Sequence, residues 1–321
     1  MNPRHTFAAT GGERMQDTEV WRGGVNAWEC DEMGHLNTRF YVMRAVEGLA
    51  MLFGQLGLPG LTHPATATTF AIEEMHIRFH REARLATPLR MTAGLLSIDA
   101  TGAEVLLVID DLASAEVKAT FRTRLRHILP ATRSPVPWPA AVARAARDRL
   151  TDLPEIAQPR STGTGPVQTR ATRARAQALQ RIAMGVVGPD RTDAFGLMGA
   201  WGFIGAVSDG VRGLTGPFRD IIAGNADPVP QRVGGAVLEF RILHLDWPRL
   251  GDAYEVRGGL MGIEGQVQKL VFWMLDPLSG RVWGSMQSIA VNFDLDSRKL
   301  IRITDKARAE LAPLVTPGLD L

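Results

Sequence analysis

Apolar residues fall into one long segment and four shorter ones in the first part of the chain. The long segment, residues 37–56, has no proline, is apolar on nearly every side and ends at Gly57 and Pro59, which predicts a helix. A helix that is apolar all round is a buried helix. Alternating or β-rich patterns predict antiparallel strands over residues 75–83, 89–98, 104–113 and 118–128. The sequence therefore predicts one central helix wrapped by a sheet.

This pattern occurs twice along the chain. A shift of 165 residues places residues 71–128 over 236–293 without a gap, and eleven of the 58 positions are identical. Chance would give about four identities for ordinary compositions. The segments that precede them align at a shift of 162, which places residues 30–41 over 192–203. Each copy is expected to have a short first strand, a loop, one long helix and several strands.

The repeat predicts an α+β protein with two tandem domains. A chain of 321 residues exceeds the usual span of one hydrophobic core, which agrees with two domains. The segment after residue 130 is rich in Pro and Arg and is expected to be a linker, with residues 140–150 as a short helix. The expected parts are a polar tail (1–18), the first domain (19–130), the linker (131–180), the second domain (181–305) and a C-terminal tail (306–321).

Charge and cysteine content narrow the function classes. The net charge is only +2, but residues 130–180 contain eight Arg against three acidic residues. This segment either contacts a phosphorylated ligand or is a solvated face. The single Cys30 provides neither an intramolecular disulfide nor a zinc framework. The first residues lack the apolar core of a signal peptide, and no run of about 18 apolar residues occurs. We therefore expect a cytoplasmic protein that does not span a membrane and binds no nucleic acid.

The segment from Glu29 to Phe40, ECDEMGHLNTRF, places three polar side chains in a turn just before the buried helix. These are Asp31, His35 and Asn37. The start of a helix presents backbone N–H groups and a partial positive charge, which can stabilise a carbonyl oxygen as it becomes an oxyanion. A nearby carboxylate can attack the carbonyl carbon or activate water. This combination predicts cleavage of a thioester without a metal ion.

The sequence DEMGHLNTRFY resembles the D-x-x-G-H-x-N-x-x-x-Y loop of the 4-hydroxybenzoyl-CoA thioesterase superfamily. A long helix enclosed by a curled antiparallel sheet is similar to the hot-dog fold of that family, and two such units resemble its double hot-dog form. The resemblance covers residues 19–129 well and residues 181–295 in degraded form. It implies hydrolysis of an acyl-CoA or acyl-carrier-protein thioester, with no cofactor. For assembly, it leaves open a homodimer of the two-domain chain.

The resemblance also implies a role for each motif position. Asp31 would be the catalytic base or nucleophile, while His35 and Asn37 would orient Asp31 and water. Backbone N–H groups near Asn37 would polarise the thioester carbonyl. The positions expected to bind the substrate are Gly34, Thr38 and Tyr41.

The second copy departs from this motif. Leu197 replaces His35 and Gly199 replaces Asn37, and Phe203 stands at the position of Tyr41. Only Asp193 and Gly196 remain. A carboxylate without its polar partners is more typical of a turn or cap residue than of a second base. We therefore expect the second copy to be a structural partner.

Other interpretations of these residues remain open. Asp31 and Asn37 could cap the helix, with His35 as a buried histidine that has a structural partner. Glu47, on the predicted helix, is either a second carboxylate of the site or a surface residue. His76 and His80 would lie about 13 Å apart on a strand, too far to share a metal ion.

Two other functions are compatible with the same fold. A hot-dog hydratase or dehydratase would be expected to carry a D-x-x-x-x-H pattern, one residue longer than the spacing from Asp31 to His35. A catalytically inactive acyl-CoA-binding protein would keep the apolar interior without turnover. The fold alone does not decide among these functions.

Overall fold

The computed structural model describes residues 18–165 and 178–319, and the chain divides into two compact units. The first unit comprises residues 1–72 and 79–158, and the second comprises residues 73–78 and 159–321. The expected N-terminal tail up to residue 17 and residues 166–177 of the expected linker lie outside the described residues.

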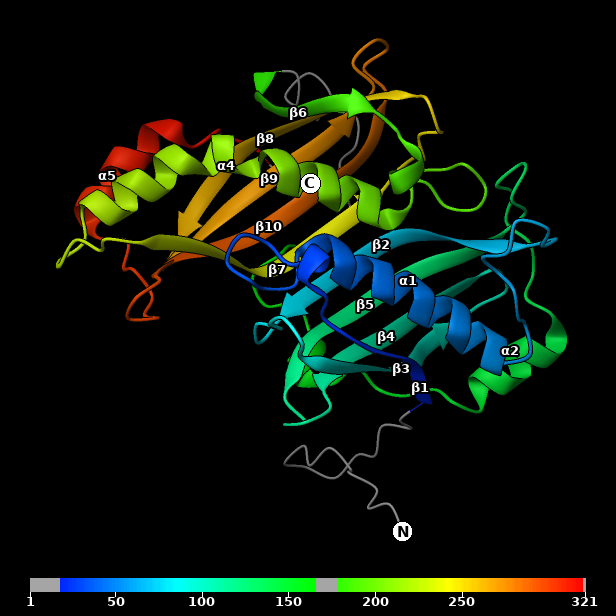
Figure 1. Cartoon of the computed structure of the whole chain (residues 1–321). Helices are drawn as coiled ribbons and strands as arrows, with labels where there is room; N and C mark the ends of the chain where they lie inside the picture. The colour runs from blue at the N-terminus through cyan, green and yellow to red at the C-terminus, as the bar shows by residue number, and fades with distance from the viewer. Residues whose placement is uncertain (1–17, 166–177, 320–321) are drawn as a thin grey trace. The chain divides into compact units, whose positions relative to one another are not determined.

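The first unit is built around helix α1 (Thr38–Gln55), which packs on an antiparallel sheet (Figure 1). The helix buries Val42, Ala45, Leu49 and Phe53. Strand β2 (Thr69–Phe79) begins and ends in this unit. The other strands, in spatial order, are β1 (Thr18–Gly24), β3 (Pro88–Ile98), β4 (Gly102–Asp111) and β5 (Val117–Ile128). The predicted helix and strands are confirmed.

The second unit repeats this arrangement around helix α4 (Ala200–Gly224). Residues 74–78 of β2 pair with its strand β7. The strands follow in the order β7 (Val233–His244), β10 (Val282–Asp294), β9 (Val267–Leu275), β8 (Ala253–Glu264) and β6 (Gln180–Val186). Each strand of the first unit thus has a counterpart with the same neighbours in the second, as the sequence repeat predicts.

Each copy ends in a further helix that the sequence repeat does not reveal. Helices α2 (Ala140–Arg147) and α5 (Asp305–Leu311) are related by the same shift of 165 residues as the strands. The chain that follows them forms equivalent bridges, from Leu150 to Leu95 and from Val315 to Leu260. These segments fall in the ranges expected as linker and C-terminal tail, so the structure extends both copies beyond the expected boundaries.

A glycine lets each long helix approach its sheet at the same repeat position. A Cβ on Gly48 would lie 2.5 Å from the Met91 sulfur, and one on Gly210 would clash with the backbone carbonyl of Ile182. Real side chains do not come this close to a neighbour without a shift of atoms. Glycine is therefore required more strictly at Gly210, where the neighbour is backbone, than at Gly48, where it is a flexible side chain.

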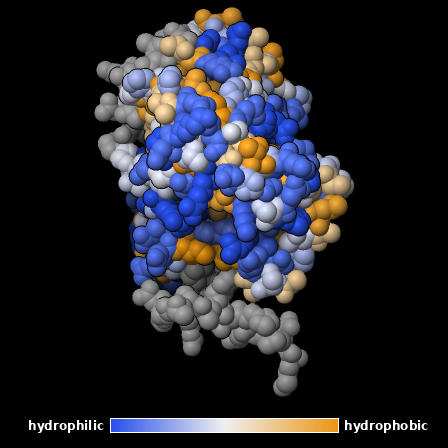
Figure 2. Space-filling model, turned by 90° about the vertical axis from the view of Figure 1, so that its left-hand side faces the viewer, coloured by the Kyte–Doolittle hydropathy of each residue, from blue (hydrophilic) through white to orange (hydrophobic). Residues whose placement is uncertain are grey.

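The surface gives fewer functional indications than the interior. On the face drawn in Figure 2, hydrophilic residues surround small, separate apolar areas. Scattered apolar side chains are normal for a protein surface, whereas a large contiguous apolar patch would indicate a binding surface. The buried polar groups are therefore the better place to look for chemistry.

Candidate active site

Asp31 closes a tight turn in front of helix α1. Its Oδ1 accepts hydrogen bonds from the backbone N–H groups of Met33 (2.9 Å) and His35 (3.0 Å). Its own N–H donates to the His35 carbonyl (2.8 Å), and Gly34 adopts a φ of +78° that glycine tolerates without strain. Among the residues that the structure describes, no hydrogen bond to the Oδ2 of half-buried Asp31 is found. One carboxylate oxygen is thus fixed while the other can face a reactant.

His35 is buried beside a carboxylate that the sequence did not point to. Its side chain Nε2 lies 3.1 Å from Oε2 of Glu82, in the loop after β2. The same carboxylate oxygen lies 3.3 Å from Arg84, and the N–H of Leu36 donates to the Ala83 carbonyl (2.8 Å). A hydrogen bond to one ring nitrogen sets the orientation and tautomer of an imidazole. Glu82 therefore holds the His35 ring in place.

Asn37 is the N-cap of helix α1. Its side-chain oxygen accepts a hydrogen bond from the N–H of Arg39 (3.0 Å), and its own N–H donates to the carbonyl of Glu29 (2.8 Å). Thr38 is the first residue of the helix and is half-buried. The structure therefore places Asp31, His35 and Asn37 in one turn that leads directly into a helix N-terminus.

Tyr41 lies beneath this turn and is 3% exposed. Its ring meets Phe79 edge-on, with ring centroids 5.3 Å apart. Burial raises the pKa of the Tyr41 phenol, although a hydrogen bond with the Ala83 backbone opposes the rise. The phenol therefore stays neutral at ordinary pH and links α1 to the same loop that carries Glu82.

The other candidates of the sequence have local partners. Glu47 is exposed, and its carboxylate lies 2.8 Å from Arg44. The Nε2 of His80 lies 3.2 Å from the hydroxyl of Thr120, and that of His76 lies 2.6 Å from Oε1 of Glu239. Residues 18–165 and 178–319 contain no group of three or more His, Cys, Asp or Glu side chains that could hold a metal ion. None of their helices has the length and hydropathy that a membrane crossing needs.

Glu239 organises a buried polar cluster in the second unit. Besides His76, its carboxylate accepts hydrogen bonds from the N–H groups of Arg160 (3.0 Å) and Ser161 (2.9 Å), and from the hydroxyl of Thr162 (2.6 Å). Burial alone would raise the pKa of Glu239, but these hydrogen bonds outweigh it and lower the pKa to about 2. The cluster fixes the segment that follows the first unit to strand β7.

The second copy contains the same turn with different side chains. Oδ1 of Asp193 accepts hydrogen bonds from the N–H groups of Phe195 (2.8 Å) and Leu197 (3.0 Å), and its own N–H donates to the Leu197 carbonyl (2.7 Å). Gly196 has a φ of +72°. Gly199 is the N-cap of α4 and offers no side-chain cap. The backbone of the turn and its aspartate are therefore retained, while the histidine and the asparagine of the first turn are replaced.

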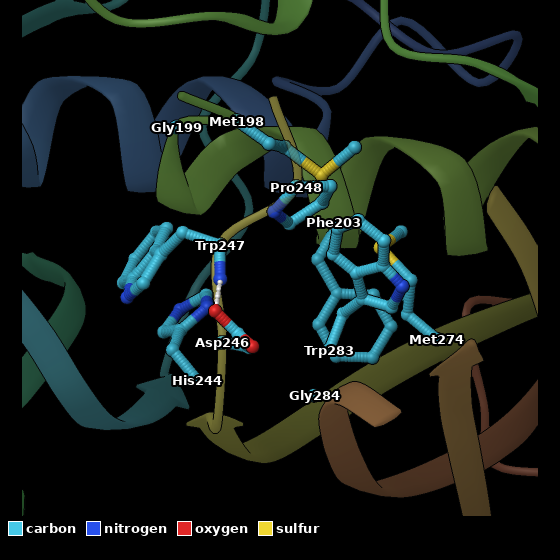
Figure 3. A pocket seen from close by; sticks show the side chains of 10 residues that line it. All are labelled: Met198, Gly199, Phe203, His244, Asp246, Trp247, Pro248, Met274, Trp283 and Gly284. Carbon is cyan, nitrogen blue, oxygen red and sulfur yellow. Dashed lines mark hydrogen bonds between the residues drawn. The ribbon is translucent and has the colours of Figure 1, made fainter. Parts of the chain in front are cut away.

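A small pocket lies beside this second turn, and four of its ten lining residues have aromatic rings (Figure 3). His244 stacks on Trp247, with ring centroids 4.5 Å apart, and Phe203 and Trp283 lie on the opposite side. Trp247 and Phe203 stand at the repeat positions of Glu82 and Tyr41. Apolar packing thus replaces the polar groups that surround the turn of the first copy.

Comparison with known proteins shows what the part of the chain around this turn is similar to. Residues 25–146 match the Thioesterase-like superfamily. The chain is 29% identical over 141 residues to a Rhizobium meliloti (strain 1021) protein, L-carnitine dehydrogenase/betainyl-CoA thioesterase. The match covers 44% of this chain and 27% of that protein, so the chain spans about a quarter of its relative's length.

Solved thioesterase structures share the whole two-unit fold. An acyl-ACP thioesterase from Bacteroides thetaiotaomicron is 12% identical, with a TM-score of 0.60, and the match covers 84% of this chain and 96% of that one. The 12:0-ACP thioesterase from Umbellularia californica is 8% identical, with a TM-score of 0.63 and coverage of 85% and 93%. At such low identity these structures show the fold alone. They confirm the predicted α+β class with two tandem hot-dog units.

Proposed function

We propose that this chain, whose residues 25–146 match the thioesterase-like superfamily, hydrolyses an acyl-CoA or acyl-carrier-protein thioester to a free acid and a thiol. The main support for the proposal is the geometry of the Asp31 carboxylate. Its Oδ1 is fixed by two backbone N–H groups, and it lies just before the N-terminus of α1. The Rhizobium meliloti relative, named in part a betainyl-CoA thioesterase, supports a CoA thioester as substrate.

In a general-base route, Oδ2 of Asp31 takes a proton from water as the water oxygen attacks the thioester carbonyl carbon. The carbonyl oxygen becomes negative, and N–H groups at the start of α1, near Asn37 and Thr38, stabilise that charge. The C–S bond then breaks, the thiolate leaves, and the proton on Asp31 passes to it. His35, held by Glu82, and Asn37 orient the carboxylate and the water.

In a nucleophilic route, Oδ2 of Asp31 attacks the carbonyl carbon itself and expels the thiolate. Water then hydrolyses the resulting mixed anhydride, which restores the carboxylate. Mass spectrometry of rapidly quenched enzyme separates the routes, because an anhydride adds the mass of the acyl group to the peptide that contains Asp31. The general-base route leaves that peptide unmodified.

A thiol-release screen across acyl-CoA chain lengths, with the wild-type chain and Asp31→Asn, tests the proposal. Asparagine keeps the shape and hydrogen-bond acceptor of Asp31 but cannot act as a base or as a carboxylate nucleophile. We expect thiol release by the wild type and its loss in the variant. Tight binding of acyl-CoA without release would indicate a binding protein, and hydration of an enoyl-CoA would indicate a hydratase. Either result would overturn the proposal.

A further inference from the structure

A buried carboxylate ties the turn of the first copy to helix α1. Glu29, which ends the short helical turn η1 (Ala27–Glu29), is 1% exposed. Its Oε2 accepts hydrogen bonds from the N–H and the side-chain amide of Asn26 (2.9 and 3.0 Å), and its Oε1 pairs with Arg44 of α1. Arg44 also lies 2.8 Å from Glu47, one helical turn further along. We call Glu29, Arg44 and Glu47 the brace.

The second copy has a brace with the opposite charge at the residue before the turn. Arg191 stands at the repeat position of Glu29, while Ala206 and Asp209 stand at the positions of Arg44 and Glu47. One guanidinium nitrogen of Arg191 lies 2.7 Å from Asp209 of α4, and another donates to the Gly202 carbonyl (3.3 Å). The second copy therefore has no arginine at the position of Arg44, and Arg191 pairs directly with Asp209 of α4.

In both copies the residue before the turn is also held to the long helix through its backbone. The carbonyl of Glu29 accepts from the N–H of Asn37 (2.8 Å), and the carbonyl of Arg191 accepts from the N–H of Gly199 (2.8 Å). Glu29 and Arg191 thus each fix, through the backbone carbonyl, the N-cap residue of the long helix. Each copy therefore holds the residue before the turn to the long helix by an ion pair, although the side chains and their charges differ.

From this we infer that Glu29 and Arg44 are positioning residues for the reaction, because they hold the turn of Asp31 and His35 against the N-terminus of α1. The inference rests on the proposed function, since it assigns these residues to the reaction of the same turn. Asp31 lies two residues after Glu29, so a displaced Glu29 moves the carboxylate relative to the helix N–H groups. A displacement of about 1 Å at a reacting group can lower a rate about 100-fold.

The test transfers the arrangement of the second copy into the first. Arg44→Ala removes the central residue of the brace, and we expect kcat to fall about 10- to 100-fold with little change in KM. Adding Glu29→Arg lets the new guanidinium reach Glu47, as Arg191 reaches Asp209. We expect this double variant to have a kcat at least about 5-fold above that of Arg44→Ala. A residue needed only for folding would not give this rescue.

A second readout separates this inference from the proposed function. Amide hydrogen exchange in residues 29–37 should be faster in Arg44→Ala and slower again in the double variant, whether or not a thioester is hydrolysed. Glu104→Gln is a matched control that removes a strand ion pair with Arg122 (2.6 Å), and its kcat should stay within about 2-fold of the wild type. Wild-type kcat in Arg44→Ala, or a folded double variant with no recovery in either readout, would overturn the inference.

Discussion

The two copies share a turn but not its side chains, and the difference separates structural from chemical requirements. Asp31 and Asp193 each bind two backbone N–H groups through Oδ1, and Gly34 and Gly196 each adopt a positive φ. The shape of the turn therefore requires an aspartate and a glycine, even in the copy that lacks the histidine and the asparagine. The paired polar residues around it are kept in one copy only. His35 and Glu82 are replaced by Leu197 and Trp247, which indicates that these two act together.

The largest expected effect comes from giving the first turn the side chains of the second. His35→Leu with Asn37→Gly should lower kcat about 100-fold, because these side chains orient Asp31 and the water, and a displacement of about 1 Å at a reacting group can lower a rate about 100-fold. The melting temperature should change little, since glycine at an N-cap costs only a few tenths of a kcal/mol and the second copy folds with Leu197 and Gly199 in the same turn. Steady-state kinetics and a thermal melt check both expectations. Full activity in the double variant would mean that these side chains are not part of the chemistry.

The second prediction compares the two helix glycines. Alanine is the better helix former by about 1 kcal/mol, but at Gly210 its Cβ meets the Ile182 carbonyl, and overpacking typically costs about 1 to 3 kcal/mol. We expect Gly210→Ala to lower the free energy of unfolding by about 1 to 2 kcal/mol. Gly48→Ala should change it by less than about 1 kcal/mol, because the Met91 side chain can move. Urea denaturation measures both, and equal losses would refute the difference between the two helix contacts.

The third prediction concerns the acid dependence of the Glu239 cluster, which lies in the second unit. The pKa of Glu239 is lowered to about 2 in the folded chain from an ordinary value of 4.5. Its contribution is therefore fully present above the unfolded value and is lost as the pH falls toward 2. Glu239→Gln should destabilise the chain by about 1 to 3 kcal/mol at pH 7, and the difference from the wild type should shrink by about 1 kcal/mol at pH 3.5. A difference that stays constant between these two pH values would contradict the lowered pKa.

Much of the fold could be predicted from the sequence because its signals are local. Residues 37–56 are apolar on nearly every side and end at Gly57 and Pro59, and the strand patterns keep their register between the copies. Helices α2 and α5 could not be paired in this way, because residues 140–150 and 305–315 share no identical position. Their equivalence follows only from where they pack.

The sequence alone indicated the residues of the turn, but not the partners that the fold brings next to them. Asp31, His35 and Asn37 lie close together in the sequence, so their spacing alone indicates a turn before a helix. Glu82 reaches His35 through the fold and lies far from it along the chain. Glu29 was hidden for another reason, because its repeat counterpart, Arg191, has the opposite charge and shows no similarity in an alignment.

The central claim is that one turn is catalytic and the other structural, and the turnover of Asp31→Asn measured beside that of Asp193→Asn tests it most directly. Both substitutions keep the side-chain oxygen that the turn requires, so both variants should melt close to the wild type. We predict that Asp31→Asn lowers kcat at least about 100-fold, whereas Asp193→Asn changes it less than about 3-fold. If Asp193→Asn is as damaging as Asp31→Asn while the fold is intact, the second copy is catalytic and the account is contradicted.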